Sequence, residues 1–151
     1  MLSAIAFVVL ALSDPATVQV EALKFDAAAI SKASKVEVKV KEKGVETTYK
    51  GVPLRSLIES QLKGPNEMAD LRNLSDAVLL IKATDGYQAA VSAAEVAMDE
   101  TGAKYLLATE KDGKPLEDKQ GPIKLIIPGD PKPIRSVRMV SGVDLVRMPK
   151  K

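Results

Sequence analysis

The chain has 151 residues, of which 22 are basic and 20 acidic, and its net charge of +2 gives no electrostatic reason to expect nucleic acid as a partner. Aromatic residues make up only 3% of the sequence, so side chains on which bases could stack are scarce as well. The sequence contains no Cys, His or Trp, which excludes a disulfide, a thiol nucleophile, a Ser-His-Asp triad and a Cys/His zinc site.

The N-terminus has the features of an export signal. The apolar run from Ala4 to Leu12 is too short to span a bilayer as a helix, and small residues occupy the −3 and −1 positions of a cleavage site after Ser13. No Lys or Arg precedes the run, so a buried first strand stays open as the alternative. We expect residues 1–13 to be the signal and residues 14–151 a single periplasmic or secreted domain, without a stable membrane span after the signal is removed.

Two short elements are predicted at the start of this domain. Val18 and Val20 alternate with polar residues, which predicts a short half-buried strand over residues 15–22. Asp26 precedes an alanine-rich stretch, and we expect its carboxylate to cap a short helix over residues 25–33.

A β-hairpin and an amphipathic helix are expected next. Over residues 35–51, valines alternate with charged residues around a turn at Lys43-Gly44, which predicts a hairpin with one solvent-exposed face. Over residues 51–62, Pro53 near the start and apolar side chains on one face predict a helix that packs on the sheet. Residues 63–76 are expected to form a loop.

The rest of the chain predicts further units of strand, turn and strand. Ser92 followed by Glu95 has the spacing of a capping box that opens a short helix. Strands are expected within residues 77–92, 104–118 and 143–148, with Asp-Gly turns inside the first two ranges. Strands in hairpins with a few short helices between them indicate an α+β domain with a mixed, mostly hairpin-built sheet.

The stretch GPIKLIIPGDPKPIRSVRMV, residues 121–140, combines an apolar strand, a proline-rich loop and two arginines. The prolines stiffen the loop, and Gly129 allows a positive φ or the close approach of a ligand. Lys132 and Arg135 flank the loop, where an ammonium and a guanidinium group can hold a phosphate. Arg135 and Arg138 fall in a β-like run, in which residues three apart point to opposite faces. They therefore cannot both serve one site as strand residues, unless Arg135 still belongs to the loop. A solvated basic loop that only joins two strands stays open as the alternative.

Four segments in a defined order carry the strongest signal in the sequence. They are YKGVPLRSLIE (49–59), ATDGYQAAVSAAEV (83–96), LLATEKDGKPLEDKQGPIKLIIPGD (106–130) and IRSVRMVSGVDL (134–145). In this order and spacing the chain from Lys35 to Val146 resembles the oxidoreductase molybdopterin-binding domain, the catalytic-domain fold of sulfite oxidase and its bacterial relatives. The resemblance implies that fold and a molybdopterin cofactor.

The same resemblance implies a molybdenum ligand that this chain lacks. In active relatives a cysteine after the early strand binds the metal through its thiolate, whereas this sequence has no Cys at all. Relatives also hold the pterin phosphate with His and Arg side chains, and two late basic positions align with Arg135 and Arg138. We therefore expect an anion or pterin-phosphate grip made by Gly129, Lys132, Arg135 and Arg138, with no catalytic residue and no metal ligand.

Three functions remain open at this point. The first is a small exported, non-catalytic binding or accessory module that holds no cofactor and takes a small anion or a redox partner protein. The second is a molybdopterin-dependent oxidoreductase whose metal is held by the dithiolene of the cofactor alone. The third is a structural partner in the cell envelope that has no small ligand. The missing thiolate favours the first over the second, because a protein ligand also tunes the electronic properties of its metal.

Overall fold

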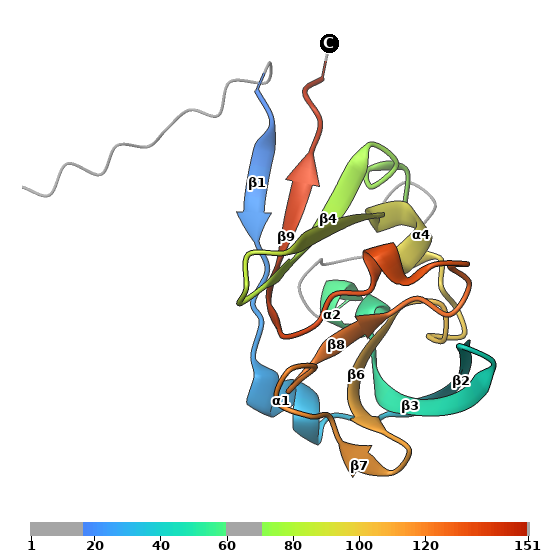
Figure 1. Ribbon diagram of the computed structural model, residues 1–151. Coiled ribbons are helices and arrows are strands. Elements are labelled where there is room, and N and C mark those ends of the chain that lie inside the picture. The colour runs from blue at the N-terminus through green and yellow to red at the C-terminus, as the bar shows by residue number, and fades with distance from the viewer. Residues whose placement is uncertain (1–16, 60–70, 151) are drawn as a thin grey trace, which may run out of the picture.

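The computed structural model describes residues 17–59 and 71–150, which form two antiparallel sheets with short helices beside them (Figure 1). The elements in chain order are β1 (Gln19–Ala22), α1 (Ala27–Lys32), β2 (Val36–Glu42), β3 (Val45–Pro53), α2 (Leu54–Glu59), β4 (Ala77–Ala83), β5 (Gln88–Ser92), α4 (Ala93–Ala97), β6 (Leu106–Lys111), β7 (Lys114–Pro115), β8 (Lys124–Ile126), the 3-10 helix η1 (Pro133–Arg135) and β9 (Val140–Arg147). The α+β class is confirmed, although the strands divide into two antiparallel sheets where a single mixed sheet was expected. The predicted signal at residues 1–13 lies outside the described residues, as does most of the predicted loop after α2.

The first sheet has the strand order β1-β9-β4-β5. Along β4 every second residue is buried, so one face of this strand lies in the main hydrophobic core. Leu79 of β4 pairs with Val91 of β5 and with Leu145 of β9, and all three side chains are buried. These cross-strand contacts make β4 and β9 the centre of the sheet.

Strand β1 forms where the alternating valines predict it, but the predicted burial is wrong. All four of its residues are exposed, and Val18 and Val20 have exposed fractions of 51% and 63%. The reason is its place in the sheet, since β1 is an edge strand that pairs with β9 along one side. The alternating pattern therefore predicted the position of the strand correctly but not its exposure.

The second sheet contains β2, β3, β6 and β7, with β8 paired to β6. The predicted hairpin is confirmed, because β2 and β3 pair along their length around a turn at Lys43 and Gly44, whose φ angles are 50° and 80°. The register between β3 and β6 shifts between Lys50 and Gly51, because these two residues pair with Glu110 and Ala108 and leave Thr109 of β6 as an extra residue. Figure 1 shows this hairpin as a strongly curved pair of strands.

The predicted helices form, with shifts at their ends. Asp26 caps α1, since its Oδ1 accepts hydrogen bonds from the backbone N–H groups of Ala28 at 3.0 Å and Ala29 at 3.2 Å. Helix α2 begins at Leu54 rather than at residue 51, because the preceding residues pair with β6 as the end of β3.

Only one half of the predicted capping box is present at α4. The Oγ of Ser92 accepts a hydrogen bond from the backbone N–H of Glu95 at 3.3 Å. The carboxylate of Glu95 instead accepts a hydrogen bond from the hydroxyl of Tyr105 at 2.5 Å. Tyr105, which precedes β6, therefore binds the Glu95 carboxylate that the capping box assigned to the N-terminus of α4.

The turn after α4 is organised around a fully buried carboxylate, that of Asp99. Its Oδ1 accepts hydrogen bonds from the Oγ1 of Thr101 and the backbone N–H of Gly102, both at 3.1 Å. Its Oδ2 accepts from the backbone N–H groups of Lys104 at 3.1 Å and Tyr105 at 3.3 Å. One side chain thus satisfies three backbone N–H groups and one hydroxyl in the connection from α4 to β6.

The segment with the two arginines has a different conformation from the one predicted. Arg135 is the last residue of η1, and Arg138 precedes the start of β9 at Val140. The prolines at 131 and 133 explain this, because proline fixes φ and removes backbone donors, which favours a turn over a strand. Arg135 and Arg138 therefore do not lie in one strand, and Arg135 belongs to the loop, as the sequence left open.

Candidate anion-binding site

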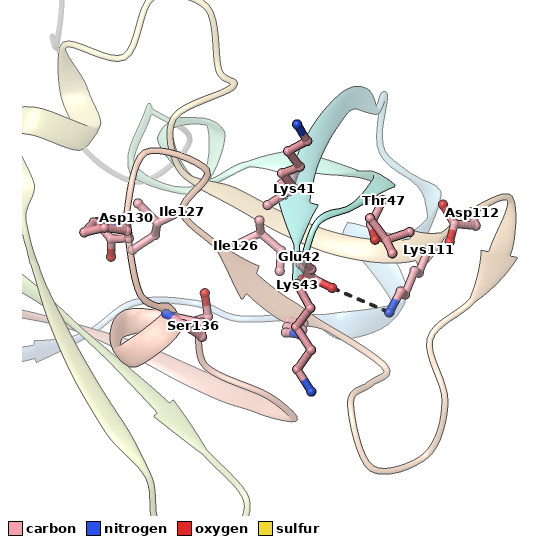
Figure 2. Close-up of a pocket in the computed structure, with 15 residues that line it drawn as sticks. Lys41, Glu42, Lys43, Thr47, Lys111, Asp112, Ile126, Ile127, Asp130 and Ser136 are labelled. Carbon is pink, nitrogen blue, oxygen red and sulfur yellow. Dashed lines mark ion pairs between the residues drawn. The ribbon is translucent and has the colours of Figure 1, made fainter.

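Three hollows surround the middle of β8, and Lys124 lines all of them. The first has a volume of about 710 Å³ and lies between the tip of the β2–β3 hairpin and the loop that contains η1 (Figure 2). In Figure 2, Asp130 and Ser136 stand on one side and Lys111 on the other, with the hairpin residues between them. The other two hollows have volumes of about 540 and 560 Å³.

The hollow of about 540 Å³ gathers three cationic side chains from separate parts of the chain. They are Lys43 from the hairpin turn, Lys124 from β8, and Arg138 from the segment before β9. Within the described residues, none of the three has a carboxylate within 4 Å. We call these residues and the space between them the basic hollow.

Polar groups that suit an anion complete the lining of the basic hollow. Ser136, Gln120 and Tyr87 contribute a hydroxyl, an amide and a phenol. One carboxylate, that of Asp85, also lines the hollow, and its Oδ1 accepts a hydrogen bond from the backbone N–H of Tyr87 at 3.0 Å. The surplus of cations over carboxylates favours a negatively charged ligand.

Lys124 is the most enclosed of the three cations. It is half-buried, and its neighbours Ile123 and Leu125 are fully buried. Burial is the main cause that lowers the pKa of Lys124; Lys111 and Arg138 lower it further, while Glu42 opposes the shift. Its ammonium group therefore costs more to keep charged than that of an exposed lysine.

A buried tyrosine lies beside Lys124. The Nζ atoms of Lys124 and Lys111 lie 5.6 and 5.9 Å from the centroid of the Tyr49 ring, within the range of cation–π attraction. The Tyr49 hydroxyl donates to the Oε1 of Glu42 at 2.7 Å, and the Oε2 of Glu42 lies 3.7 Å from Lys111 Nζ. Burial first, and then Glu42, raise the pKa of the Tyr49 hydroxyl, so this phenol stays neutral and acts as a fixed donor.

Arg135, which the sequence predicted as an anion ligand, is already paired. Its Nε and Nη2 donate to the two carboxylate oxygens of Asp130 at 2.9 and 2.6 Å. This hydrogen-bonded contact is the first cause that raises the pKa of Arg135. The guanidinium group therefore holds the two ends of the proline-rich loop together instead of facing the basic hollow.

Two further contacts fix the same loop. The hydroxyl of Tyr87 donates a hydrogen bond to the backbone carbonyl of Ile134, which joins the β4–β5 turn to η1. Tyr105 lies beside Arg135, and burial together with the hydrogen bond to Glu95 raises the pKa of Tyr105 to about 12. These contacts join the η1 side of the basic hollow to both sheets.

Of the four predicted site residues, only Arg138 lies in the basic hollow. Lys132 is exposed on the loop and lines none of the three hollows, so the prediction that it grips the same anion is not supported by its position. Gly129 has no positive φ, and a Cβ there would have no atom within 4 Å. The first reason given for a glycine at this place, a positive φ, therefore does not apply, while the close approach of a ligand stays a prediction.

Sequence reasoning missed Lys43 and Lys124. Lys43 was interpreted only as a turn residue, whereas its side chain lines the same hollow as Lys124 of β8. Lys124 carried a usable signal, since a lysine between apolar residues in a predicted buried strand is rarely without a partner or a role.

A comparison with protein families gives one match, in which the model of the oxidoreductase molybdopterin-binding domain covers residues 17–151. The chain belongs to this family. No curated protein matches the sequence. The match covers all the described residues, so both sheets and the basic hollow are parts of one molybdopterin-binding domain.

This family member has no thiolate or imidazole side chain to offer molybdenum as a ligand. The sequence has no Cys or His, and the described residues contain no group of three or more Asp or Glu side chains placed to hold a metal ion. The cations of the basic hollow suit a phosphate or another small anion instead. Within residues 17–59 and 71–150, no helix is both long and apolar enough to cross a bilayer.

Proposed function

We propose that this protein is an exported, non-catalytic binding module of the molybdopterin-binding fold that takes a small anion in the basic hollow. One observation carries the proposal: Lys43, Lys124 and Arg138 line one space, and no carboxylate of the described residues lies within 4 Å of them. In most folded proteins a half-buried lysine is paired, because an isolated charge is costly to remove from water. An anion that bridges these side chains would offset that cost.

The non-catalytic part of the proposal rests on the missing thiolate. A protein ligand normally fixes the geometry of a catalytic metal and tunes its electronic properties, and this chain has no Cys to supply it. The second candidate is an oxidoreductase in which the dithiolene of molybdopterin alone holds the metal. Membership of the family favours that candidate, since the basic hollow also suits the phosphate of a pterin.

Removing one cation should weaken anion binding. We expect Arg138→Ala to raise the dissociation constant for inorganic phosphate about tenfold, because one charge-assisted hydrogen bond contributes about 1.5 kcal/mol. Isothermal titration at low ionic strength measures this, because salt screens exposed charges such as Arg138.

Lys132→Ala is the matched control for that titration. It removes one positive charge from the exposed loop nearby without altering the lining of the basic hollow. We expect its phosphate affinity to equal that of the unaltered protein. Equal affinities for the Arg138 and Lys132 variants would contradict the proposed site, because the effect would then depend only on net charge.

Metal analysis separates the two candidate functions. After expression in a host that makes molybdopterin, we expect no molybdenum in the purified protein, because no side chain can supply a thiolate. Elemental analysis and the fluorescence of released pterin measure both components. Near-stoichiometric molybdenum and pterin would overturn the non-catalytic proposal in favour of the second candidate. The mass of the same preparation reports export, since removal of residues 1–13 gives a chain that begins at Asp14.

A further inference from the structure

We propose that Lys124 is a carbonyl-reactive amine, and that the basic hollow takes a small anion that also carries an aldehyde, which Lys124 binds covalently as an imine. This inference rests on the proposed anion-binding function and extends it from the charge of the ligand to its reactive group. No other lysine among the described residues combines a half-buried amine with the lining of three hollows.

The position of Lys124 gives its amine access to a ligand. Lys124 is anchored by β8, whose backbone pairs with β6 at Ala108. Its Nζ lies over the Tyr49 ring, and within the described residues no carboxylate lies within 4 Å of it. The amine is therefore placed in a lined space but is not held by an ion pair that would have to break first.

The burial of Lys124 favours the neutral, nucleophilic form of the amine. Burial is the first cause that lowers the pKa of Lys124; Glu42 opposes it, and the positive charges of Lys111 and Arg138 lower the pKa further. A desolvated lysine next to other cations is a recognised way to activate an amine for attack on a carbonyl.

The proposed step needs no oxidant, reductant or metal. The lone pair of Nζ attacks the aldehyde carbon, and the electron pair of the C=O bond moves to oxygen. Proton transfer from nitrogen to oxygen gives a carbinolamine, which loses water to form the C=N bond. Hydrolysis reverses the step and restores both the amine and the aldehyde.

The other two cations of the basic hollow determine which aldehydes react. Lys43 and Arg138 reach the same hollow from the hairpin turn and from the segment before β9, so they are placed to hold the anionic group of the ligand. Holding this group near Nζ turns a bimolecular addition into a reaction within one complex. An aldehyde without a negative charge lacks this advantage.

Labelling with pyridoxal 5′-phosphate tests the proposal, because this probe carries an aldehyde and a phosphate. The full chain is incubated with the probe near neutral pH, the imine is reduced with borohydride, and the labelled peptide is identified by mass spectrometry. We expect Lys124 to be the main labelled residue, and we expect inorganic phosphate to prevent the labelling. Labelling spread evenly over the exposed lysines would overturn the proposal.

Variants and a second probe distinguish failure of this inference from failure of the proposed function. We expect Lys124→Arg to lose the label, since it removes the amine nucleophile. If phosphate binds the unaltered protein but no imine forms on Lys124, the inference fails and the anion-binding function stands. If pyridoxal without its phosphate labels Lys124 equally well, the role given to Lys43 and Arg138 is wrong. Because site mapping uses the unaltered protein, the test does not depend on the folding of any variant.

Discussion

Gly51→Ala is expected to lower the free energy of unfolding by about 3 kcal/mol or more, which is the upper end of the usual cost of overpacking. A Cβ on Gly51 would lie 2.1 Å from the carbonyl oxygen of Leu107 and 2.6 Å from the Cα of Ala108. Both are backbone atoms of β6, so no side chain can rotate to relieve the contact. Gly51 lies opposite the extra residue of β6, at the register shift between the two strands, and the strands would have to separate there.

Urea unfolding followed by circular dichroism measures this change, and Gly129→Ala is the matched control. A Cβ at Gly129 would have no atom within 4 Å, and the residue has no positive φ. We expect that variant to stay within about 0.5 kcal/mol of the unaltered protein. Similar stabilities for the two variants would show that β3 and β6 do not approach as closely as described.

The same substitution should also weaken anion binding. Ala108 of β6 pairs with Lys124 of β8, so a shift of β6 away from β3 moves the half-buried lysine of the basic hollow. If the Gly51→Ala protein folds, its phosphate affinity therefore reports the same shift of β6 as its stability does.

Asp99→Ala is expected to lower the free energy of unfolding by about 4 kcal/mol. The carboxylate of Asp99 is fully buried and accepts hydrogen bonds from Thr101 and from three backbone N–H groups. Truncation leaves these donors without their partner, and each unsatisfied buried donor costs about 1–3 kcal/mol. Water that enters the opened space can bind some of these donors. We therefore expect a loss of about 4 kcal/mol, which is less than the added costs of all four donors.

Two further variants make the Asp99 prediction specific. Asp99→Asn keeps one carbonyl oxygen but places an NH₂ group where two backbone donors need an acceptor, so we expect about half of the loss. Asp26→Ala removes an exposed helix cap and should cost only about 1 kcal/mol. Thermal and urea unfolding rank the three variants, and equal losses for Asp99→Ala and Asp26→Ala would contradict the role of the buried carboxylate.

Local patterns predicted the elements whose stability depends on neighbouring residues in the chain. The hairpin around Lys43-Gly44 and the cap at Asp26 were correct, because the turn conformation and the capping contact involve only residues nearby in sequence. The capping box at Ser92 was half correct, because Tyr105 recruits the Glu95 carboxylate from outside the helix. The exposure of Val20 was missed for a similar reason, since it depends on where β1 lies in the sheet.

The candidate site was harder to predict than the fold. Arg138 was named from its own segment, but its neighbours Lys43 and Lys124 come from different strands and meet only through the packing of the hairpin against β8. Arg135 was misassigned because the sequence does not reveal that Asp130 would satisfy its guanidinium group. Charge alone identifies cations, whereas tertiary contacts decide which of them remain available to a ligand.

The contacts that fasten the proline-rich loop affect the entropy of binding. The pair of Arg135 and Asp130 and the hydrogen bond from Tyr87 to Ile134 order the wall of the hollow in the absence of any ligand. Ordering a mobile side chain on binding costs about 0.5–1.5 kcal/mol. The side chains of this wall are already ordered in the folded protein, so binding does not carry that cost for them. The hollow is therefore preorganised on its η1 side, and the ordering that binding still requires falls on the long exposed side chains of Lys43 and Arg138.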